Sequence, residues 1–225
     1  RAGSGKVTIG VPRSILSDIL SRNPEIMSYP MPEAGGALDV DVEMLKDFCK
    51  DKDVIAFGPG LSVTENTKRL ARDLVATIDL PLVIDADGIN CLVDQVDLFF
   101  QKTGGPVIIT PHPGEMSGLV GLSTRQVQEN RTEVARGFAL KHKLYCVLKG
   151  ARSVTATPTG QLLINSSGNP GMAVAGMGDV LTGLIASLVG QYRRIMDVGR
   201  VIAAGVYIHG ICGDIVAASQ GEIGL

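Results

Sequence analysis

The chain has 225 residues, which is enough for one large domain, or at most two small ones, and for one substantial hydrophobic core. Apolar residues make up 45% and charged residues 20%, a balance that excludes a disordered chain, a collagen-like chain and a coiled coil. The formal net charge is -2. We therefore predict neither nucleic acid nor a membrane as a partner, because nucleic acid and anionic membrane surfaces attract basic chains.

The cysteines at positions 49, 91, 146 and 212 form no CxxC pair, and only three histidines are present. This pattern assigns no metal site and predicts reduced cysteines, packed in the core of a cytoplasmic protein. The longest apolar stretches, such as Leu80–Ile84, are too short to span a bilayer, and the chain opens without signal-peptide character.

Short apolar and β-branched runs alternate with helical stretches along the chain. The runs are continuously apolar rather than alternating, which is typical of strands buried on both faces of a parallel sheet. The pattern predicts an α/β fold with a mostly parallel sheet and helices on both faces. The expected strands are Val7–Val11, Val54–Phe57, Leu82–Ile84, Val107–Ile109 and Tyr145–Leu148.

Helices and one hairpin are expected between and after these strands. The Ser123–Gln126 segment has the form of a capping box. It predicts a helix with Val127, Val134 and Phe138 on one face. Two further strands are expected to form a hairpin around Pro158–Gly160, near one edge of the sheet. The other expected helices cover residues 64–77, 179–192 and 197–219, and the hairpin strands are Val154–Ala156 and Leu162–Ile164.

Glycine-rich turns follow three of the expected strands, at Gly58–Gly60, Asp85–Gly88 and Thr110–Gly114. The carboxyl ends of parallel strands share one edge of a sheet, and α/β sheets bind ligands at that edge. We therefore expect these turns to border the functional site. Gly58–Gly60 taken alone is equally compatible with a plain tight turn.

A longer glycine-rich loop, Gly168–Asp179, runs into the start of an apolar helix. A helix start presents free N–H groups and a partial positive charge, so this loop predicts a phosphate site. The spacing matches neither the P-loop nor the GxGxxG pattern, and so gives no support for a Walker or Rossmann site. Asp179 is either the helix N-cap or a general base beside the anion, and the local sequence weights the two roles equally.

The segment Gly176–Asp179 resembles the GxGD signature of the ribokinase-like superfamily. Five further segments, in this order, are together similar to the ADP/ATP-dependent NAD(P)H-hydrate dehydratase family over essentially the whole chain. The resemblance implies a single domain over residues 1–225 with the ribokinase-like three-layer fold, a mostly parallel sheet with helices on both faces. The five segments are Gly58–Leu61, Val83–Asn90, Thr110–Met116, Val147–Ala151 and Asn165–Met172.

The resemblance implies a repair enzyme for nicotinamide nucleotides, a carbon–oxygen lyase. The family removes the water that NADH or NADPH takes up at C6 of the nicotinamide ring. It uses ADP or ATP to phosphorylate the resulting hydroxyl before phosphate leaves. Mg²⁺ is implied as the ion that bridges the nucleotide phosphates. The form of Ala175–Gly178 is similar to bacterial relatives that tend to use ADP.

Residue by residue, the resemblance implies that Asp179 is the base on the C6 hydroxyl. Asp179, Gly60 and His112 are implied to contact the hydrated dinucleotide. The implied anion hole consists of the N–H groups of Ala175, Gly176, Met177 and Gly178. The implied nucleotide contacts are Lys149, Gly150, Ala151, Arg152, Ser153, Gly176, Met177 and Gly178, and no metal ligand is assigned.

Other polar residues near these turns have structural alternatives. His112 lies between two prolines, a poor place for core packing, which favours a ligand role. Asp85 and Asp87 are candidates for a position near Mg²⁺, but Asp87 is favoured as a turn cap. Glu115 is left unassigned because it is equally an ordinary first-turn acid, and His209 is expected to be a packed core histidine.

The chain departs from the family pattern in two ways. The family usually carries another strand and a glycine- and alanine-rich helix before a segment like residues 1–5, and continues past a segment like 221–225. The expectation is therefore that this chain lacks both parts. Ser62 stands where a glycine often follows the GPGL run. Relatives often form tetramers, which implies a homo-oligomer, and the family leaves room for an upstream epimerase domain.

Two other functions stay open on the sequence. A small-molecule kinase of the hydroxyethylthiazole or hydroxymethylpyrimidine type would share the fold, the anion hole and Asp179, but Thr110–Glu115 and Gly168–Met172 favour the dehydratase. The other is a nucleotide-sensing or partner-binding module without turnover. The presence of Asp179, Lys149 and the glycine-rich loop argues against it.

Overall fold

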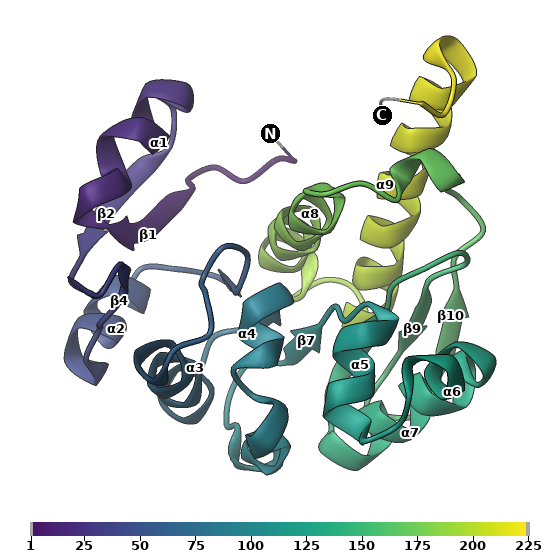
Figure 1. Ribbon diagram of the computed structural model, residues 1–225, viewed down its shortest axis with the longest axis horizontal. Helices are drawn as coiled ribbons and strands as arrows, with labels where there is room; N and C mark the ends of the chain where they lie inside the picture. The colour runs from purple at the N-terminus through teal and green to yellow at the C-terminus, as the bar shows by residue number, and fades with distance from the viewer. Residues whose placement is uncertain (1, 224–225) are drawn as a thin grey trace.

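The computed structural model describes residues 2–223, apart from the side chain of Gln101, and its centre is a six-stranded sheet (Figure 1). The strands are β5 Ile55–Phe57, β6 Leu82–Ile84, β7 Val107–Ile109, β8 Tyr145–Leu148, β9 Val154–Ala156 and β10 Leu162–Ile164. They follow the order β10-β9-β8-β7-β6-β5, in which β5 to β8 are parallel and β9 and β10 are antiparallel. The register pairs Ala56 with Val83 and Val83 with Ile108.

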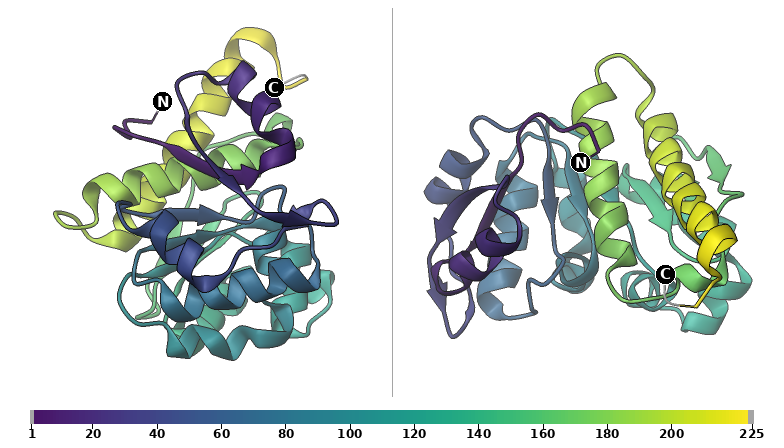
Figure 2. Two further views of the ribbon diagram at one scale, coloured as in Figure 1. Left: turned by 90° about the vertical axis from the view of Figure 1, so that its left-hand side faces the viewer. Right: turned by 90° about the horizontal axis from the view of Figure 1, so that it is seen from above.

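Helices cover both faces of this sheet, so the molecule has three layers (Figures 1 and 2). The helices are α1 Leu16–Arg22, α2 Val42–Cys49, α3 Glu65–Thr77, α4 Ala86–Asn90, α5 Pro113–Val120, α6 Thr124–Glu129, α7 Arg131–His142, α8 Met177–Tyr192 and α9 Val198–Gln220. Three 3-10 turns lie at Arg13–Ile15, Val93–Gln101 and Pro170–Met172. α8 and α9 pack on one face, whereas α3, α5 and α7 pack on the other. The mostly parallel sheet and the three-layer α/β fold expected from the sequence are confirmed.

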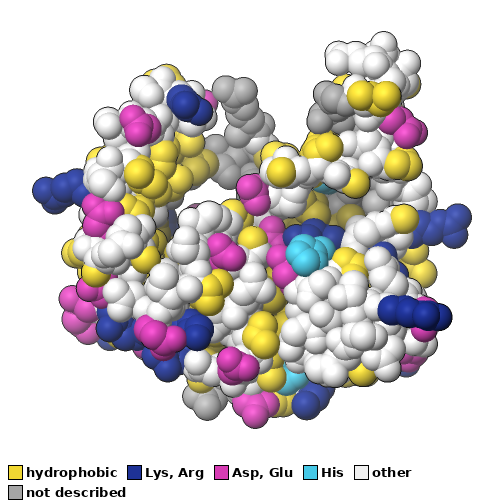
Figure 3. Space-filling view, in the orientation of Figure 1, with side chains coloured by type: hydrophobic (Ala, Val, Ile, Leu, Met, Phe, Trp, Pro, Cys, Tyr) yellow, Lys and Arg dark blue, Asp and Glu magenta, His cyan; other side chains and the backbone are white. Residues whose placement is uncertain are grey.

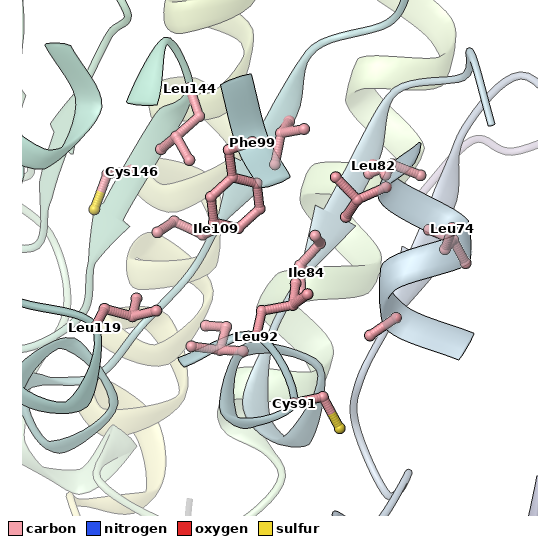
Figure 4. Packing of buried hydrophobic residues seen from close by; sticks show 14 of the residues in the cluster. Leu74, Leu82, Ile84, Cys91, Leu92, Phe99, Ile109, Leu119, Leu144 and Cys146 are labelled. Carbon is pink, nitrogen blue, oxygen red and sulfur yellow. The ribbon is translucent and has the colours of Figure 1, made fainter. Parts of the chain in front are cut away.

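Side chains of the parallel strands pack on both faces of the sheet. Val83, Ile108 and Val147 form one cluster with α8 and α9. Their sequence neighbours, including Ile84 and Ile109, point to the opposite face and join the larger cluster of Figure 4. All five side chains are at most 1% exposed. Burial of a side chain of this size stabilises the fold by about 1.5–3 kcal/mol, which explains why the runs are continuously apolar.

The helical region after β7 differs from its expected form. The capping box expected over Ser123–Gln126 is present. The single helix expected to follow it is wrong, because Asn130 leaves helical geometry and separates α6 from α7. Val127 therefore lies on α6, whereas Val134 and Phe138 lie on α7.

α9 has 23 residues and is apolar along most of its length. By length and composition it is the one helix within residues 2–223 that would reach across a membrane, and 33% of its most apolar window is buried. Val201, Ile202 and Val206 are at most 3% exposed and pack in the cluster shared with α8 and the sheet. A core helix meets the same length and composition criterion, and this packed face accounts for much of the apolar composition.

The segment before β5 forms a smaller unit at the edge of the main sheet (Figures 1 and 2). Its strands are β1 Thr8–Pro12, β2 Met27–Met31, β3 Glu33–Ala34 and β4 Ala37–Leu38. The strand expected over Val7–Val11 is present as β1, but it pairs in parallel with β2 in a separate two-stranded sheet. β1 and β5 both line a cavity of about 1230 Å³.

The hairpin expected around Pro158–Gly160 is confirmed as β9 and β10, and β10 is an edge strand. Cys49, Cys91 and Cys146 are buried, whereas Cys212 is exposed, so the expectation of four core cysteines is wrong for Cys212. Burial raises the pKa of Cys146 to about 12, which keeps this thiol protonated at neutral pH.

His142 generates a prediction about stability at acid pH. It is 2% exposed and packs among Phe99, Phe100 and Phe138. Burial lowers the pKa of His142. The unfolded chain therefore takes up this proton first, and the free energy of unfolding falls as the pH drops below about 6.5. We expect His142→Phe to lose less of its unfolding free energy between about pH 7.5 and 5.5 than the unchanged protein, measured by urea denaturation. An equal loss in both proteins would contradict this.

Candidate active site

A buried ion pair joins the ends of two parallel strands. Asp85, which is 1% exposed, directly follows β6, and Lys149 directly follows β8. The Lys149 ammonium donates to Asp85 Oδ1 at 2.6 Å, and the Thr182 hydroxyl donates to Asp85 Oδ2 at 2.7 Å. The backbone N–H of Lys149 also donates to Pro111 O at 2.8 Å. This network therefore ties β6, β8, the end of β7 and α8 together at the carboxyl edge of the sheet.

A second carboxylate, Glu115, lies beside this pair and is 8% exposed. Its Oε2 accepts from the backbone N–H of His112 at 2.7 Å and lies 3.8 Å from Lys149 Nζ. The Nδ1 atom of His112 accepts from the N–H groups of Gly114 and Glu115, so His112 is the N-cap of α5. Because Nδ1 is an acceptor, Nε2 is the donor atom of the ring, and it lies 3.4 Å from Glu115 Oε1.

The turns after β5 and β6 approach each other closely. Gly58 has φ +125°, and a Cβ at this position would overlap the carbonyl oxygen of Asp85, so only glycine fits. Asp87 Oδ2 accepts from the N–H of Ser62 at 2.9 Å, and Asn90 Nδ2 lies 3.4 Å from Asp87 Oδ1. These contacts support the structural interpretation of Asp87. Ser62 has φ +65°, a left-handed conformation that glycine adopts more easily.

The glycine-rich loop ends at the start of α8, two residues earlier than expected. Gly176 is the N-cap, with φ +88°, and Asp179 is the third residue of the helix. The interpretation of Asp179 as the N-cap is therefore wrong. The N–H of Val180 is the first to bond back along the helix, to Gly176 O at 3.1 Å. The N–H of Met177, expected in the anion hole, donates to Val174 O at 3.4 Å. The N–H groups of Gly178 and Asp179 have no helical carbonyl partner, so they and the helix dipole can hold an anion.

Asp179 and Gly60 line the cavity that β1 and β5 also line. Among the described residues, no hydrogen-bond or ion-pair partner contacts the Asp179 carboxylate. Thr182 lines the same cavity while its hydroxyl reaches Asp85. Figure 3 shows this face hollowed beside the smaller unit, with acidic, basic and histidine side chains gathered near its centre. Thr182 therefore connects the cavity with the buried ion pair, and Asp179, one turn earlier on α8, lines the cavity.

The turn Lys149–Ser153 connects β8 with β9 and is held from one side by Arg131 at the start of α7. The Arg131 guanidinium donates to Leu148 O at 2.9 Å. Gly150 has φ +141°, and a Cβ there would overlap the same guanidinium. The Ser153 hydroxyl closes the turn by donating to Gly150 O at 3.1 Å. Ala151 and Arg152 are exposed at its tip.

The structure brings the sequence-predicted residues to one edge of the sheet, in two groups. Gly60 and Asp179 line the cavity, whereas Lys149 and His112 do not. Gly178 connects the groups, because a Cβ there would lie 3.4 Å from Lys149 Nζ. In the described part of the chain, no group of three or more His, Cys, Asp and Glu side chains could hold a metal ion.

The sequence analysis missed two residues of this region. Thr182 lies in an apolar helix, and a buried hydroxyl among aliphatic residues is a weak signal. Arg131 lies far along the chain from Gly150, and no motif joins the two. His112 was expected as a ligand, and its role as the cap of α5 was not foreseen, although the side chain of Glu115 completes a capping box with it.

The buried ion pair makes a prediction about stability. Asp85→Asn leaves the Lys149 ammonium without its counter-ion, and Lys149→Met leaves the Asp85 carboxylate without one. Removing one partner of a buried pair costs about 3–5 kcal/mol. We expect each single variant to lose about 3 kcal/mol of unfolding free energy in urea, and the double variant to lose less than the sum by at least about 1 kcal/mol.

The exposed pair Lys46–Glu43, with its charged atoms 3.2 Å apart, is the matched control. The same cycle with Lys46→Met and Glu43→Gln should give a coupling below about 0.5 kcal/mol. If the double variant of Asp85 and Lys149 loses as much unfolding free energy as the two single variants together, the proposed coupling of the two strands is contradicted.

The sequence model of the NAD(P)H-hydrate dehydratase family matches residues 1–224. The chain is 42% identical over 226 residues to the bifunctional NAD(P)H-hydrate repair enzyme Nnr of Moorella thermoacetica. That alignment covers 99% of this chain and 42% of the relative, so the chain spans less than half the length of this curated relative.

Solved structures agree with this match. The ADP/ATP-dependent NAD(P)H-hydrate dehydratase of Bacillus subtilis, co-crystallised with ATP/Mg²⁺ and soaked with CoA, has a TM-score of 0.82 at 31% identity. That comparison covers 100% of this chain and 77% of the other. A hydroxyethylthiazole kinase from Pyrococcus horikoshii has a TM-score of 0.66 at 12% identity, over 97% of this chain and 83% of the kinase. The kinase shares the fold alone, and the expected ribokinase-like fold is confirmed. The match of the family model over nearly the whole sequence places the chain in the NAD(P)H-hydrate dehydratase family.

Proposed function

We propose that this chain catalyses the nucleotide-dependent dehydration of hydrated NADH and NADPH. One observation carries the proposal: Asp179 presents an unpaired carboxylate to the cavity from the first turn of α8, beside amides that have no helical partner. A base and an anion site are thus combined at one helix start. This combination suits the transfer of a phosphoryl group to a hydroxyl.

The nucleotide would lie along the turn Lys149–Ser153, with its phosphates toward the amides of Ala175–Gly178. The positive end of the α8 dipole favours negative charge at this place. Gly178 lets the backbone approach the phosphates, and the Lys149 ammonium lies next to it. Lys149 is oriented by Asp85, and its side chain is 18% exposed, so the ammonium would reach a phosphate oxygen.

The residues present fit a Mg²⁺ ion bound mainly by the nucleotide phosphates better than a Mg²⁺ ion bound only by protein side chains. Both oxygens of Asp85 are engaged by Lys149 and Thr182, which leaves Asp179 as a carboxylate without a partner at the helix start. Mg²⁺ commonly keeps several waters and binds one or two carboxylates together with phosphates. When bound, Mg²⁺ would neutralise charge on the nucleotide phosphates.

The hydrate would occupy the cavity side, against Gly60 and Asp179. Asp179 takes the proton of the C6 hydroxyl as that oxygen attacks the terminal phosphoryl group, and the bond to the departing nucleotide breaks. The phosphorylated oxygen then leaves C6 as phosphate, and loss of a proton from the neighbouring ring carbon restores the double bond. Overall, hydrated NADH and ADP give NADH, AMP and phosphate. His112, whose side chain is 56% exposed, would contact the dinucleotide.

Features outside the site support three further parts of the proposal. The bifunctional relative is more than twice as long as the matched region, which supports a second domain in the full-length protein, and we propose that this domain is the epimerase. α9 exposes Tyr207, Ile208 and Ile215, which supports association into a homo-oligomer such as a tetramer. The buried, unpaired thiols of Cys49, Cys91 and Cys146 support a reducing, cytoplasmic location.

The role of Asp179 is tested by Asp179→Asn. Asp179 is not a cap and has no partner among the described residues, so we expect the free energy of unfolding to change by no more than about 1 kcal/mol. The variant should bind ADP with near-normal affinity, because the amides and Lys149 remain. Its turnover should fall at least about 100-fold, since general-base assistance is typically worth ~10²–10⁴-fold.

Glu43→Gln is the matched control, because Glu43 is an exposed first-turn acid of α2. It should lose a similar amount of helix-dipole stabilisation and none of its turnover. Near-normal turnover of Asp179→Asn, with or without a loss of stability, would refute the proposed mechanism.

The anion site is tested by two substitutions of Gly178. A Cβ at this position would meet Lys149 Nζ at 3.4 Å and Asp85 Oδ2 at 3.5 Å, which is ordinary contact. We expect Gly178→Ala to keep measurable turnover and Gly178→Val, whose branches extend into the phosphate position, to lose both ADP affinity and turnover. Isothermal titration with ADP and steady-state kinetics give the two readouts. Normal ADP binding by Gly178→Val would place the phosphates elsewhere.

A further inference from the structure

α9 holds the loop Asn165–Met172 through a carboxylate outside the site described above. Asp214 Oδ2 accepts from the N–H of Gly168 at 2.8 Å, and Asp214 Oδ1 accepts from Asn169 Nδ2 at 3.0 Å. Both bonds hold the pKa of Asp214 below its ordinary value, and the bond from the Gly168 N–H has the larger effect. The carboxylate is therefore ionised at neutral pH, and both bonds are charge-assisted.

The backbone of α9 lies directly against this loop. A Cβ at Gly210 would overlap Ser167, and a Cβ at Gly213 would overlap the sulfur of Met172. The Ser167 hydroxyl donates to Tyr207 O at 2.8 Å. The two glycines thus allow close contact between helix and loop, and Asp214 fixes the position of the loop along the helix.

The loop leads straight into the start of α8. Asn169 Oδ1 accepts from the N–H of Gly171 at 3.1 Å and caps the turn Pro170–Met172. Only residues 173–175 separate this turn from the N-cap Gly176. Burial lowers the pKa of His209, also on α9, and the nearby backbone of Met177 opposes this shift. α9 therefore holds the start of the segment that carries the proposed anion hole and lies near its end.

We propose that Asp214 is a positioning residue for the phosphoryl-transfer step. By fixing Gly168 and Asn169 against α9, it sets where the amides of Ala175–Gly178 lie relative to Asp179. Asp214 does not line the cavity, so it acts through the loop and not by touching the hydrate. The inference rests on the proposed function, and it adds a residue that no motif of the sequence analysis contains.

Swapping the two side chains tests the proposal. With Asp214→Asn alone, the new amide oxygen can accept from Gly168, but its NH₂ then faces the NH₂ of Asn169. With Asn169→Asp alone, two carboxylates face each other. The double variant restores all three bonds, because the carboxylate introduced by Asn169→Asp accepts from the amide introduced by Asp214→Asn and still accepts from the N–H of Gly171.

We expect each single variant to lose at least about tenfold in kcat/KM for the hydrate, and the double variant to return to within about threefold of the unchanged protein. Amide hydrogen exchange over residues 168–178 should be faster in the single variants and normal in the double variant. Asp197→Asn is the control. The side chain of Asp197 accepts from the Arg200 N–H at the other end of α9, a bond that asparagine keeps, so both readouts should be unchanged.

Normal kcat/KM in Asp214→Asn would overturn the proposal, as would a double variant no better than Asp214→Asn. If the single variants fail to fold, the double variant decides the question: near-normal kcat/KM supports the proposal, and a tenfold loss overturns it. If the unchanged protein turns over no hydrate, the proposed function fails. The exchange rates of the four proteins then still show whether Asp214 positions the segment.

Discussion

The buried carboxylate of Asp85 is the constraint on which the rest of the site depends. It lies at the end of β6, accepts from Lys149 at the end of β8 and from Thr182 on α8, and is almost fully excluded from water. An ionised group in such a place is stable only with both oxygens engaged. The positions of two strands and one helix are therefore coupled, and the start of α8 is held against the carboxyl edge of the sheet.

The hydrogen bonds around Asp85 hold together, at this edge of the sheet, two regions that the proposed reaction needs. The turn Lys149–Ser153 follows β8, whereas Gly60 and Asp179 line the cavity. On α9, Asp214 accepts hydrogen bonds from Gly168 and Asn169 and so holds the loop that leads into α8. The glycines at the close approaches are needed because side chains there would push these segments apart.

Local patterns predicted the strands β5 to β8, the hairpin β9–β10 and α8. Continuous apolar runs indicate buried elements, and turn residues indicate where the chain reverses. The same patterns predicted β1 but not its pairing with β2 in a separate sheet, since strand pairing depends on contacts that no local pattern encodes. The break at Asn130 was also missed, because helical periodicity continues across it. In the site, the glycine turns indicated the correct sheet edge. The bond between Asp85 and Lys149 joins residues 64 positions apart, a long-range contact that one sequence cannot reveal.

The central claim is that this chain uses a nucleotide to turn its substrate's hydroxyl into a leaving group and then expels it. The most direct measurement follows recovery of the reduced-nicotinamide absorbance and release of phosphate together, with hydrated NADH, ADP and Mg²⁺. The account predicts equal amounts of NADH and phosphate, and neither product when the nucleotide is omitted. Accumulation of a phosphorylated hydrate without NADH would identify a kinase instead. ADP binding with no consumption of ADP would identify a sensing module, and either result would contradict the account.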